Sequence, residues 1–200
     1  MPVDNSAESP GRRFNYPFTG PTLCLGAVLG VAGTWLRTSG RPWWCACEVP
    51  FLWSGDIQSS HNSQHLFDPY SFTHMLHGVI FFWLLAVLLP RVSVPWRFVG
   101  ALTLEALWEL LENSNLVIER YRTATMALGY EGDTIANSQG DVLSCALGFF
   151  LALQLGAWGS LALFIVTKLV LVVWVRDSLT LSTLMLIHPI EALKTWQQGA

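Results

Sequence analysis

Two short patterns of histidine and glutamate have the residue types and the spacing that metal binding and proton transfer require. His74 and His77 are three residues apart, so on a helix they share a face and can point at one centre. Glu105, Glu109 and Glu112 repeat at a similar spacing and fall within about 60° of one another on a helix. Imidazoles mixed with carboxylates suit zinc, manganese or iron, and a carboxylate beside such a metal can act as a general base.

A third polar segment lies further along the chain, at the entry to the last apolar stretch. If the apolar stretches cross a membrane, the loop before His74 and the loop after Glu112 lie on the same side, so the three polar segments converge there. The candidate metal ligands are His74, His77, Glu109, Glu112 and Asp141. The candidate catalytic groups are Glu109, Glu112 and Asp141, and the candidate substrate-binding residues are Arg122, Asn113, Asp133 and Asn137.

The composition of the chain is that of a membrane protein. The 200 residues include 11 Lys or Arg and 14 Asp or Glu, and 52% are apolar, whereas a soluble domain carries about a quarter charged residues. The ranges 14–36, 69–90 and 142–167 contain no Asp, Glu, Lys or Arg, and each is long enough to cross a bilayer. A net charge of −3 without a basic cluster disfavours nucleic-acid binding. The expected partner is the lipid bilayer.

The apolar ranges predict an all-α fold, a polytopic transmembrane helical bundle. We expect single spans at about 21–36, 72–89 and 98–118. The range 142–175 is too long for one span of about 30 Å, so we expect a hairpin that turns at 156–159. This gives five spans, or four plus a re-entrant hairpin, in one integral-membrane domain over 21–200 that follows a mobile tail over 1–20. The C-terminal residues predict an interfacial amphipathic helix interrupted at Pro189.

The glutamate stripe is costly if it faces lipid, because an acidic residue at the centre of a spanning helix costs roughly 2.5–3.5 kcal/mol. The three side chains are therefore expected to face protein, either protonated or paired with His, Arg or a metal ion. Three interpretations remain open: a buried structural network, a metal-assisted or acid–base active site, and a proton or ion pathway. Glu105 separates the last two, because its place about 10 Å from Glu112 suits a conduction path and is remote from a site at the membrane surface.

Two cysteines and two histidines of the first long loop form a weaker pattern. His61 and His65 have the spacing of a helical metal pair but lack the glutamate of the zinc-protease motif, so a solvated loop is the expected interpretation. Cys45 and Cys47 are either a metal or redox pair or surface thiols. The absence of C-x-x-C spacing favours surface thiols, and two cysteines so close together are poorly placed for a disulfide with each other.

The order of the motifs resembles a known family. The motifs are Asp68-Pro-Tyr-Ser-Phe-Thr-His74-Met-Leu-His77-Gly78, Glu105-Ala-Leu-Trp-Glu109-Leu-Leu-Glu112-Asn113, Asn137-Ser-Gln-Gly-Asp141 and Arg176-Asp177-Ser. Over residues 42–198 the chain resembles an uncharacterised UPF-type family of bacterial inner-membrane proteins. The resemblance implies a multi-pass protein of the bacterial cell membrane and no particular activity. A fainter similarity links the early histidine, the mid-helix glutamate and the late aspartate to VanZ-like membrane proteins, whose Asp-Lys pair ahead of the histidine is missing here.

The patterns together favour a small integral-membrane enzyme that acts on a lipid-linked or envelope substrate at one membrane face. In this hypothesis the histidines and carboxylates hold a divalent metal, zinc, manganese or iron, and Arg122 binds an anionic headgroup. Two alternatives belong to other classes: a proton- or ion-coupled transporter that uses the glutamate stripe, and a non-catalytic assembly or scaffold protein that binds another membrane protein. The sequence lacks a serine-nucleophile elbow, a P-loop and a dinucleotide fingerprint, so those enzyme classes have no support.

Overall fold

The computed structural model describes residues 19–49, 51–125, 127 and 129–199, and this part of the chain is all-α. Its seven helices are α1 (Thr19–Thr38), α2 (Ser71–Leu88), α3 (Val94–Glu112), α4 (Asn115–Ala124), α5 (Ile135–Val175), α6 (Leu179–Ile187) and α7 (Glu191–Gln198). The expected mobile tail over 1–20 lies outside the described residues except for Thr19 and Gly20, which already belong to α1.

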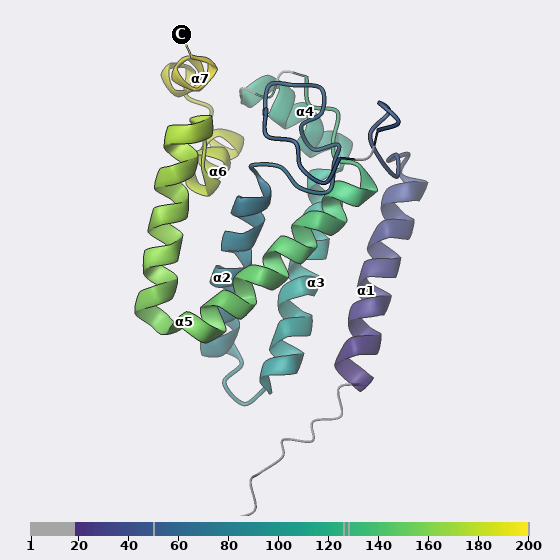
Figure 1. Cartoon of the computed structure of the whole chain (residues 1–200), viewed down its shortest axis with the longest axis vertical. Coiled ribbons are helices and arrows are strands. Elements are labelled where there is room, and N and C mark those ends of the chain that lie inside the picture. The colour runs from purple at the N-terminus through teal and green to yellow at the C-terminus, as the bar shows by residue number, and fades with distance from the viewer. Residues whose placement is uncertain (1–18, 50, 126, 128, 200) are drawn as a thin grey trace, which may run out of the picture.

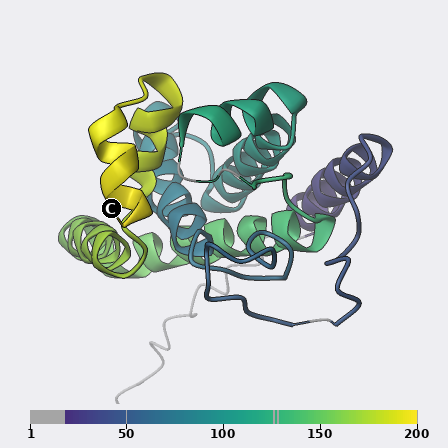
Figure 2. The same ribbon diagram turned by 90° about the horizontal axis from the view of Figure 1, so that it is seen from above.

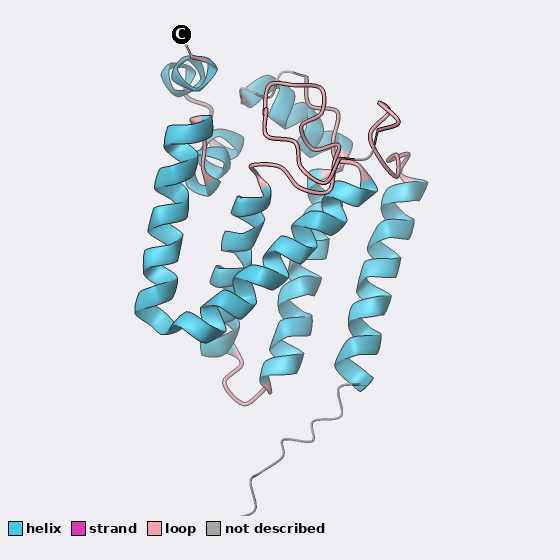
Figure 3. Cartoon of the chain, in the orientation of Figure 1, coloured by secondary structure: helices cyan, strands magenta, loops and turns pink. Residues whose placement is uncertain are grey.

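The long helices run side by side and gather most of the loops at one end of the molecule. In Figure 1 the helices α1, α2 and α3 and the two limbs of α5 stand together, and α4, α6 and α7 lie at the upper end. The long loop between α1 and α2 covers the same end, whereas the short connection between α2 and α3 lies at the opposite end (Figure 3). Seen from above in Figure 2, α6 and α7 lie on the opposite side of the molecule from α1. We call the end that carries α4, α6 and the long loop the polar end.

The helix α5 contains the expected reversal. Gly156 has a φ of 65° and a ψ of −170°, a left-handed backbone conformation that only glycine adopts readily. The two limbs, 135–155 and 157–175, run in opposite directions from this point (Figure 1). The helix begins at Ile135, seven residues earlier than expected, because the Thr134 hydroxyl accepts a hydrogen bond of 3.1 Å from the backbone N–H of Asn137 and caps it.

The third helix differs from the prediction at both ends. It begins at Val94, because Pro95 falls in the first turn, where a missing N–H is no loss. It ends at Glu112, and Ser114 caps a separate helix, α4. The expected helix over 98–118 is therefore wrong at its C-terminal end, and Glu119, on α4, lies outside the glutamate stripe with its side chain 67% exposed.

In the described part of the chain, two helices, α2 and α5, are long and apolar enough to cross a membrane. Their outer surfaces are apolar, since Val87 on α2 is 74% exposed and Leu169 and Val173 on the second limb of α5 are 60% and 85% exposed. Five spans stay a prediction. At the C-terminus the helix is interrupted around Pro189 as expected, which separates α6 from α7.

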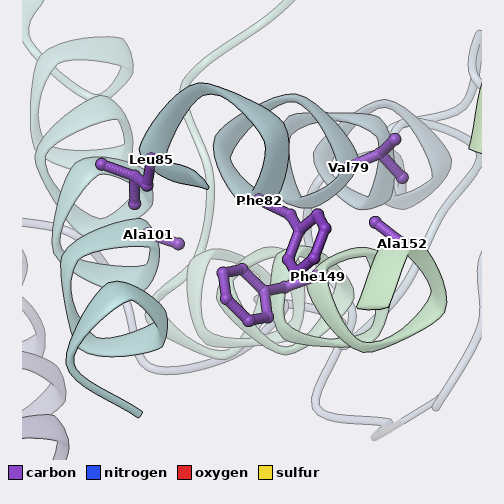
Figure 4. Close-up of a cluster of buried hydrophobic side chains, with 6 residues drawn as sticks. All are labelled: Val79, Phe82, Leu85, Ala101, Phe149 and Ala152. Atoms are coloured by element: carbon purple, nitrogen blue, oxygen red, sulfur yellow. The ribbon is translucent and has the colours of Figure 1, made fainter. Parts of the chain in front are cut away.

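The helices α2 and α5 cross in very close contact because glycines lie at the crossing. A Cβ atom on Gly148 would overlap the carbonyl oxygen of Met75, and one on Gly78 would overlap that of Cys145. Small residues of this kind allow two backbones to approach, as in membrane helix pairs. An apolar cluster continues from the crossing toward the end opposite the polar end (Figure 4). It consists of Val79, Phe82, Leu85, Ala101, Phe149 and Ala152.

Candidate metal centre

Asp68 fixes the start of α2, the helix that carries His74. Its Oδ1 accepts hydrogen bonds from the backbone N–H groups of Tyr70, at 2.7 Å, and Ser71, at 3.3 Å. Its Oδ2 accepts a hydrogen bond of 3.0 Å from the backbone N–H of Ser63, so the carboxyl group joins the long loop to the first turn of the helix. Burial raises the pKa of Asp68, and the neighbouring Asp133 raises this pKa further.

His74 lies at the centre of the polar end with carboxylates on both sides of its ring. Nδ1 of His74 lies 2.5 Å from Oε1 of Glu105 and 3.3 Å from Oε1 of Glu109. Nε2 of His74 lies 3.9 Å from Oδ2 of Asp141. All four residues are buried, with exposed fractions of 6% or less. Three helices, α2, α3 and α5, therefore bring one imidazole and three carboxylates into a single buried cluster.

Glu105 fixes the tautomer of both histidines. Nδ1 of His77 lies 3.0 Å from Oε2 of Glu105, and Nδ1 of His74 contacts the other oxygen of the same carboxylate. An ionised carboxylate only accepts hydrogen bonds, so each Nδ1 carries a proton and each neutral ring presents a lone pair at Nε2. A carboxylate that holds the far nitrogen of a histidine is the usual partner of a metal-binding imidazole.

The carboxylate of Glu109 has no hydrogen-bond partner for either oxygen among the described residues, although it is 1% exposed. The nearest basic atom is Nδ1 of His74, whose proton is directed at Glu105. An unsatisfied buried polar group costs about 1–3 kcal/mol, and more when it is charged. Glu109 is therefore the least satisfied group of the cluster.

Two sets of three ligand atoms lie within 4.8 Å of one another, as a metal ion requires. One set is His74, Glu109 and Asp141, and the other is His74, His77 and Glu105. Of the five candidate ligands from the sequence, only Glu112 belongs to neither set. Its side chain lines a neighbouring cavity, and its Oε2 has no hydrogen-bond partner among the described residues.

The candidate substrate-binding residue Asn113 instead joins α3 to the loop before α5. Its Nδ2 donates a hydrogen bond of 2.8 Å to Oδ2 of Asp133, and its Oδ1 accepts one of 2.7 Å from the backbone N–H of Asp133. The hydroxyl of Tyr130 donates to Oδ1 of the same aspartate at 2.8 Å. Burial raises the pKa of Asp133, while the hydrogen bonds from Tyr130 and Asn113 lower it.

Asn137, a second candidate for substrate binding, holds the long loop on α5. Its Nδ2 donates a hydrogen bond of 2.8 Å to the carbonyl oxygen of His65. Gly140 lies one turn further along α5, where a Cβ atom would overlap the carbonyl oxygen of Leu66. This close contact between loop and helix places the next residue, Asp141, against His74, and the hydroxyl of Ser71 donates to Oδ1 of Asp141 at 2.9 Å.

The candidate headgroup ligand Arg122 points away from the cluster. Its Nε donates a hydrogen bond to the carbonyl oxygen of Tyr130, and its side chain lines a separate depression beside Arg41. Arg120 is the arginine that lines the cavity next to the cluster. Its guanidinium is held by the C-terminal end of α6, with Nε donating to the carbonyl oxygen of Leu186 at 2.7 Å.

A cavity of about 580 Å³ opens beside the cluster, between α2, α3, α4 and α6. His74, Glu112 and Asp141 form part of its polar wall. The remaining wall is largely apolar and includes Trp108, Leu116, Val117, Leu179, Met185 and Leu186. A cavity of this size with a few convergent polar groups is typical of a small-molecule site.

Two members of the site were assigned differently from the sequence. Glu105 was placed with the conduction path, but it contacts both histidines. Arg120 was not among the candidates, although it lines the cavity and Arg122 does not. Residue spacing on one helix could not predict the contacts of Glu105 or the place of Arg120 at the cavity, because both depend on how neighbouring helices pack.

The fold and the site of the described residues define a class of protein. It is all-α, with two membrane-length apolar helices and a buried cluster of histidine and carboxylates. The chain belongs to the family described as "Protein of unknown function (DUF2585)", whose model matches residues 36–199. This confirms the resemblance to an uncharacterised bacterial family.

The relatives of the chain are UPF0314 proteins. The chain is 40% identical over 177 residues to one from Brucella anthropi, covering 88% of this chain and 90% of that protein. It is 46% identical over 160 residues to one from Rhizobium etli, covering 80% and 82%, and 42% identical over 170 residues to one from Paracoccus denitrificans, covering 85% and 88%. No solved structure matches the chain. The names of these relatives give neither a location nor an activity.

Proposed function

We propose that the protein is a multi-pass enzyme of the bacterial inner membrane that uses a divalent cation to hydrolyse a lipid-linked substrate. The observation that carries this proposal is Glu109, a buried carboxylate without a hydrogen-bond partner that lies 3.3 Å from His74. A cation held by Glu109, His74 and Asp141 supplies the positive charge that the buried carboxylates lack. Zinc, manganese and iron suit this set of one imidazole and two carboxylates.

The residues of the cluster divide into three roles. His74, Glu109 and Asp141 would hold the ion. Glu105 positions His74 through Nδ1, which leaves Nε2, 3.9 Å from Oδ2 of Asp141, as the ligand atom of His74. The ion, when bound, supplies an electrophile for a carbonyl or phosphoryl oxygen and lowers the pKa of a water molecule. Glu112, on the cavity wall with a free oxygen, takes the proton of the attacking water as general base.

The membrane location is supported by the outer surfaces of the long helices. Large apolar side chains along both limbs of α5 are exposed, among them Leu147 at 54% on the first limb and Val173 at 85% on the second. A continuous apolar surface of this kind is unusual on a soluble monomer and is expected on a helix that faces lipid. With α1 and α3 alongside, we infer five spans in a single domain, with the polar end at one membrane face.

The lipid-linked substrate is supported by the cavity. Its apolar wall, which includes Trp108 and Leu116, suits an acyl or prenyl chain, and its polar wall at Asp141 suits the bond to be cleaved. Arg120 adds a positive charge to the wall and favours an anionic headgroup such as a phosphate ester. Arg122 has no part in this proposal, because it lies outside the cavity.

The apolar packing next to Glu105 disfavours the transport alternative. One turn further from the polar end, Ala101 on α3 packs with Val79 and Phe82 in the apolar cluster of Figure 4. The rings of Phe82 and Phe149 meet there with centroids 5.1 Å apart. A proton pathway requires ionisable groups or water along its length, so this packing favours an enzyme with one open face.

Metal analysis of detergent-purified protein tests the proposal. The measurement uses a background variant in which Cys45 and Cys47 are replaced by serine, so that these two thiols bind no metal. In this background we expect about one equivalent of zinc, manganese or iron. The metal should be lost in His74→Ala and kept in the exposed control Glu119→Gln. Incubation with micelles of a bacterial lipid extract should release water-soluble headgroups, measured by mass spectrometry. Glu112→Gln should reduce the release and keep the metal. A folded protein without bound metal contradicts the proposal, and a stoichiometric partner protein in its place favours a scaffold.

A further inference from the structure

The long loop between α1 and α2 brings four side chains of metal-binding type together. Cys45 and Cys47 follow the end of α1, and His61 and His65 precede the start of α2. One ligand atom of each residue lies within 4.8 Å of the ligand atoms of the other three. None of these residues has a role in the proposed hydrolysis, so this second cluster is independent of the His74 cluster.

Two separations between the ligand atoms are close to the edges of a tetrahedral site. Nδ1 of His61 lies 3.6 Å from Sγ of Cys45 and 3.1 Å from Nε2 of His65. With zinc bonds of about 2.3 Å to sulfur and about 2.0 Å to nitrogen, a sulfur and a nitrogen ligand of one tetrahedral ion lie roughly 3.5 Å apart and two nitrogen ligands roughly 3.3 Å apart. The structure pairs the sulfur atoms of Cys45 and Cys47 as a disulfide, so the expectation from their spacing was wrong. The reduced form of the pair is the one that can bind a metal.

The surroundings of the four residues are sheltered. His65 is 1% exposed and Cys45 is 8% exposed, and the ring of Phe51 packs edge-on against both imidazoles with centroids 6.3 and 5.1 Å away. The backbone N–H of Cys47 donates to Sγ of Cys45 at 3.2 Å. Hydrogen bonds to sulfur and an apolar wall are the outer features that stabilise a thiolate ligand.

We propose a second metal site, a structural zinc centre with two thiolate and two imidazole ligands, built by Cys45, Cys47, His61 and His65. Two thiolates select zinc over magnesium or manganese. Reduction of the disulfide takes up two electrons and two protons, which a thiol or phosphine reductant supplies, and each thiol releases its proton when it binds the ion. Binding at Nε2 places the proton of His65 on Nδ1, so the 3.4 Å contact of Nδ1 with the backbone N–H of Phe51 opens.

The zinc centre fastens the loop that forms part of the cavity wall. The carbonyl oxygen of His65 accepts a hydrogen bond from Asn137, and the carbonyl oxygen of Ser63 accepts one of 3.1 Å from the backbone N–H of Thr134. Ser63 also lines the cavity. The ion therefore ties the far end of the loop, at Cys45, to the segment that is held on α5.

Cobalt substitution of the full-length protein tests the second site. The protein is purified in detergent with a phosphine reductant, stripped with a chelator and titrated with Co²⁺, whose bond to a thiolate produces a charge-transfer band in the near ultraviolet. We expect the band to saturate at one equivalent, to disappear on addition of Zn²⁺ and to be lost in Cys45→Ser. His74→Ala should keep the band, because that site contains no sulfur ligand, and Cys24→Ser should keep it as a thiol control.

Two control measurements check that the variant is folded and that the wild type is reduced. Circular dichroism checks that Cys45→Ser folds, and the mass after alkylation checks that the thiols of Cys45 and Cys47 are free in the reduced wild type. A folded, reduced wild type without the charge-transfer band overturns the proposal. So does a band that persists when both cysteines are replaced by serine. A band that is unchanged in both His61→Ala and His65→Ala would show that neither imidazole binds the ion and would overturn it equally.

Discussion

Replacing Glu109 by glutamine should change the thermal stability of the protein in opposite directions in the absence and presence of the metal ion. Without the ion, the substitution removes a buried charge that has no hydrogen-bond partner. We expect a gain of about 1–2 kcal/mol from this loss of charge. For a chain of 150–250 residues this raises the melting temperature by roughly 2–8 °C.

With the ion, the same substitution removes a ligand. At a free ion concentration of 100 times the Kd, binding stabilises the wild type by about 2.7 kcal/mol, or roughly 5–11 °C. A loss of about 100-fold in affinity reduces this to about 0.4 kcal/mol in Glu109→Gln, or less than roughly 2 °C.

The assay is the melting of detergent-solubilised protein, followed by tryptophan fluorescence, with and without added zinc or manganese. Serine at Cys45 and Cys47 removes the second metal site from the measurement. Glu119→Gln, whose side chain is 67% exposed, is the matched control and should change neither value. A Glu109→Gln protein that melts below the wild type without metal and keeps the full metal-induced shift would refute the role of this carboxylate.

Three further outcomes follow from the structure. Glu105→Gln, which alters a positioning residue without removing a ligand, should weaken metal affinity about 10–100-fold in a dialysis measurement; unchanged affinity would argue against the Glu105 role. Gly148→Ala, where a Cβ would overlap the carbonyl of Met75, should destabilise by about 1–3 kcal/mol. Gly100→Ala, with a nearest contact of 3.5 Å, should melt at or above the wild type; equal melting of the two variants would count against the close helix crossing. Burial raises the pKa of Asp177 to about 6, so the folded state binds its proton more tightly than the unfolded state does. The protonated carboxyl group therefore adds on the order of 3 kcal/mol to the free energy of unfolding below about pH 4, and this contribution is lost as the pH rises through 6. Asp177→Asn should therefore stabilise at pH 7.5 but not at pH 4, and a gain independent of pH would contradict the assignment.

The broad fold could be predicted from the sequence because composition and glycine positions are local signals. The length of the last apolar stretch and Gly156 together required a reversal, and the helix reverses there. The end of α3 could not be predicted, because Asn113 ends the helix while bonded to Asp133, twenty residues later in the chain. The start of α5 was missed for a different reason: the prediction followed the apolar residues, which begin at Val142, whereas the first turns of the helix, 135–141, contain polar side chains such as Asn137 and Asp141.

The residue types of the His74 cluster followed from the sequence, but the neighbours of each residue did not. Glu105 lies about 10 Å from Glu112 along α3, and this distance suggested that it was remote from the site. However, α2 leaves the polar end while α3 approaches it, so His77 lies level with Glu105. The pairing of Cys45 with His61 depends in the same way on the path of a long loop, which residue spacing does not determine.

The most direct test of the His74 cluster as a metal centre is X-ray absorption at the metal edge on the protein with serine at Cys45 and Cys47. We expect a first shell of nitrogen and oxygen donors at about 2.0–2.2 Å, with the outer-shell scattering of an imidazole that disappears in His74→Ala. A spectrum identical to that of the ion in buffer, or one that is unchanged in His74→Ala, would contradict the assignment of the metal to this cluster.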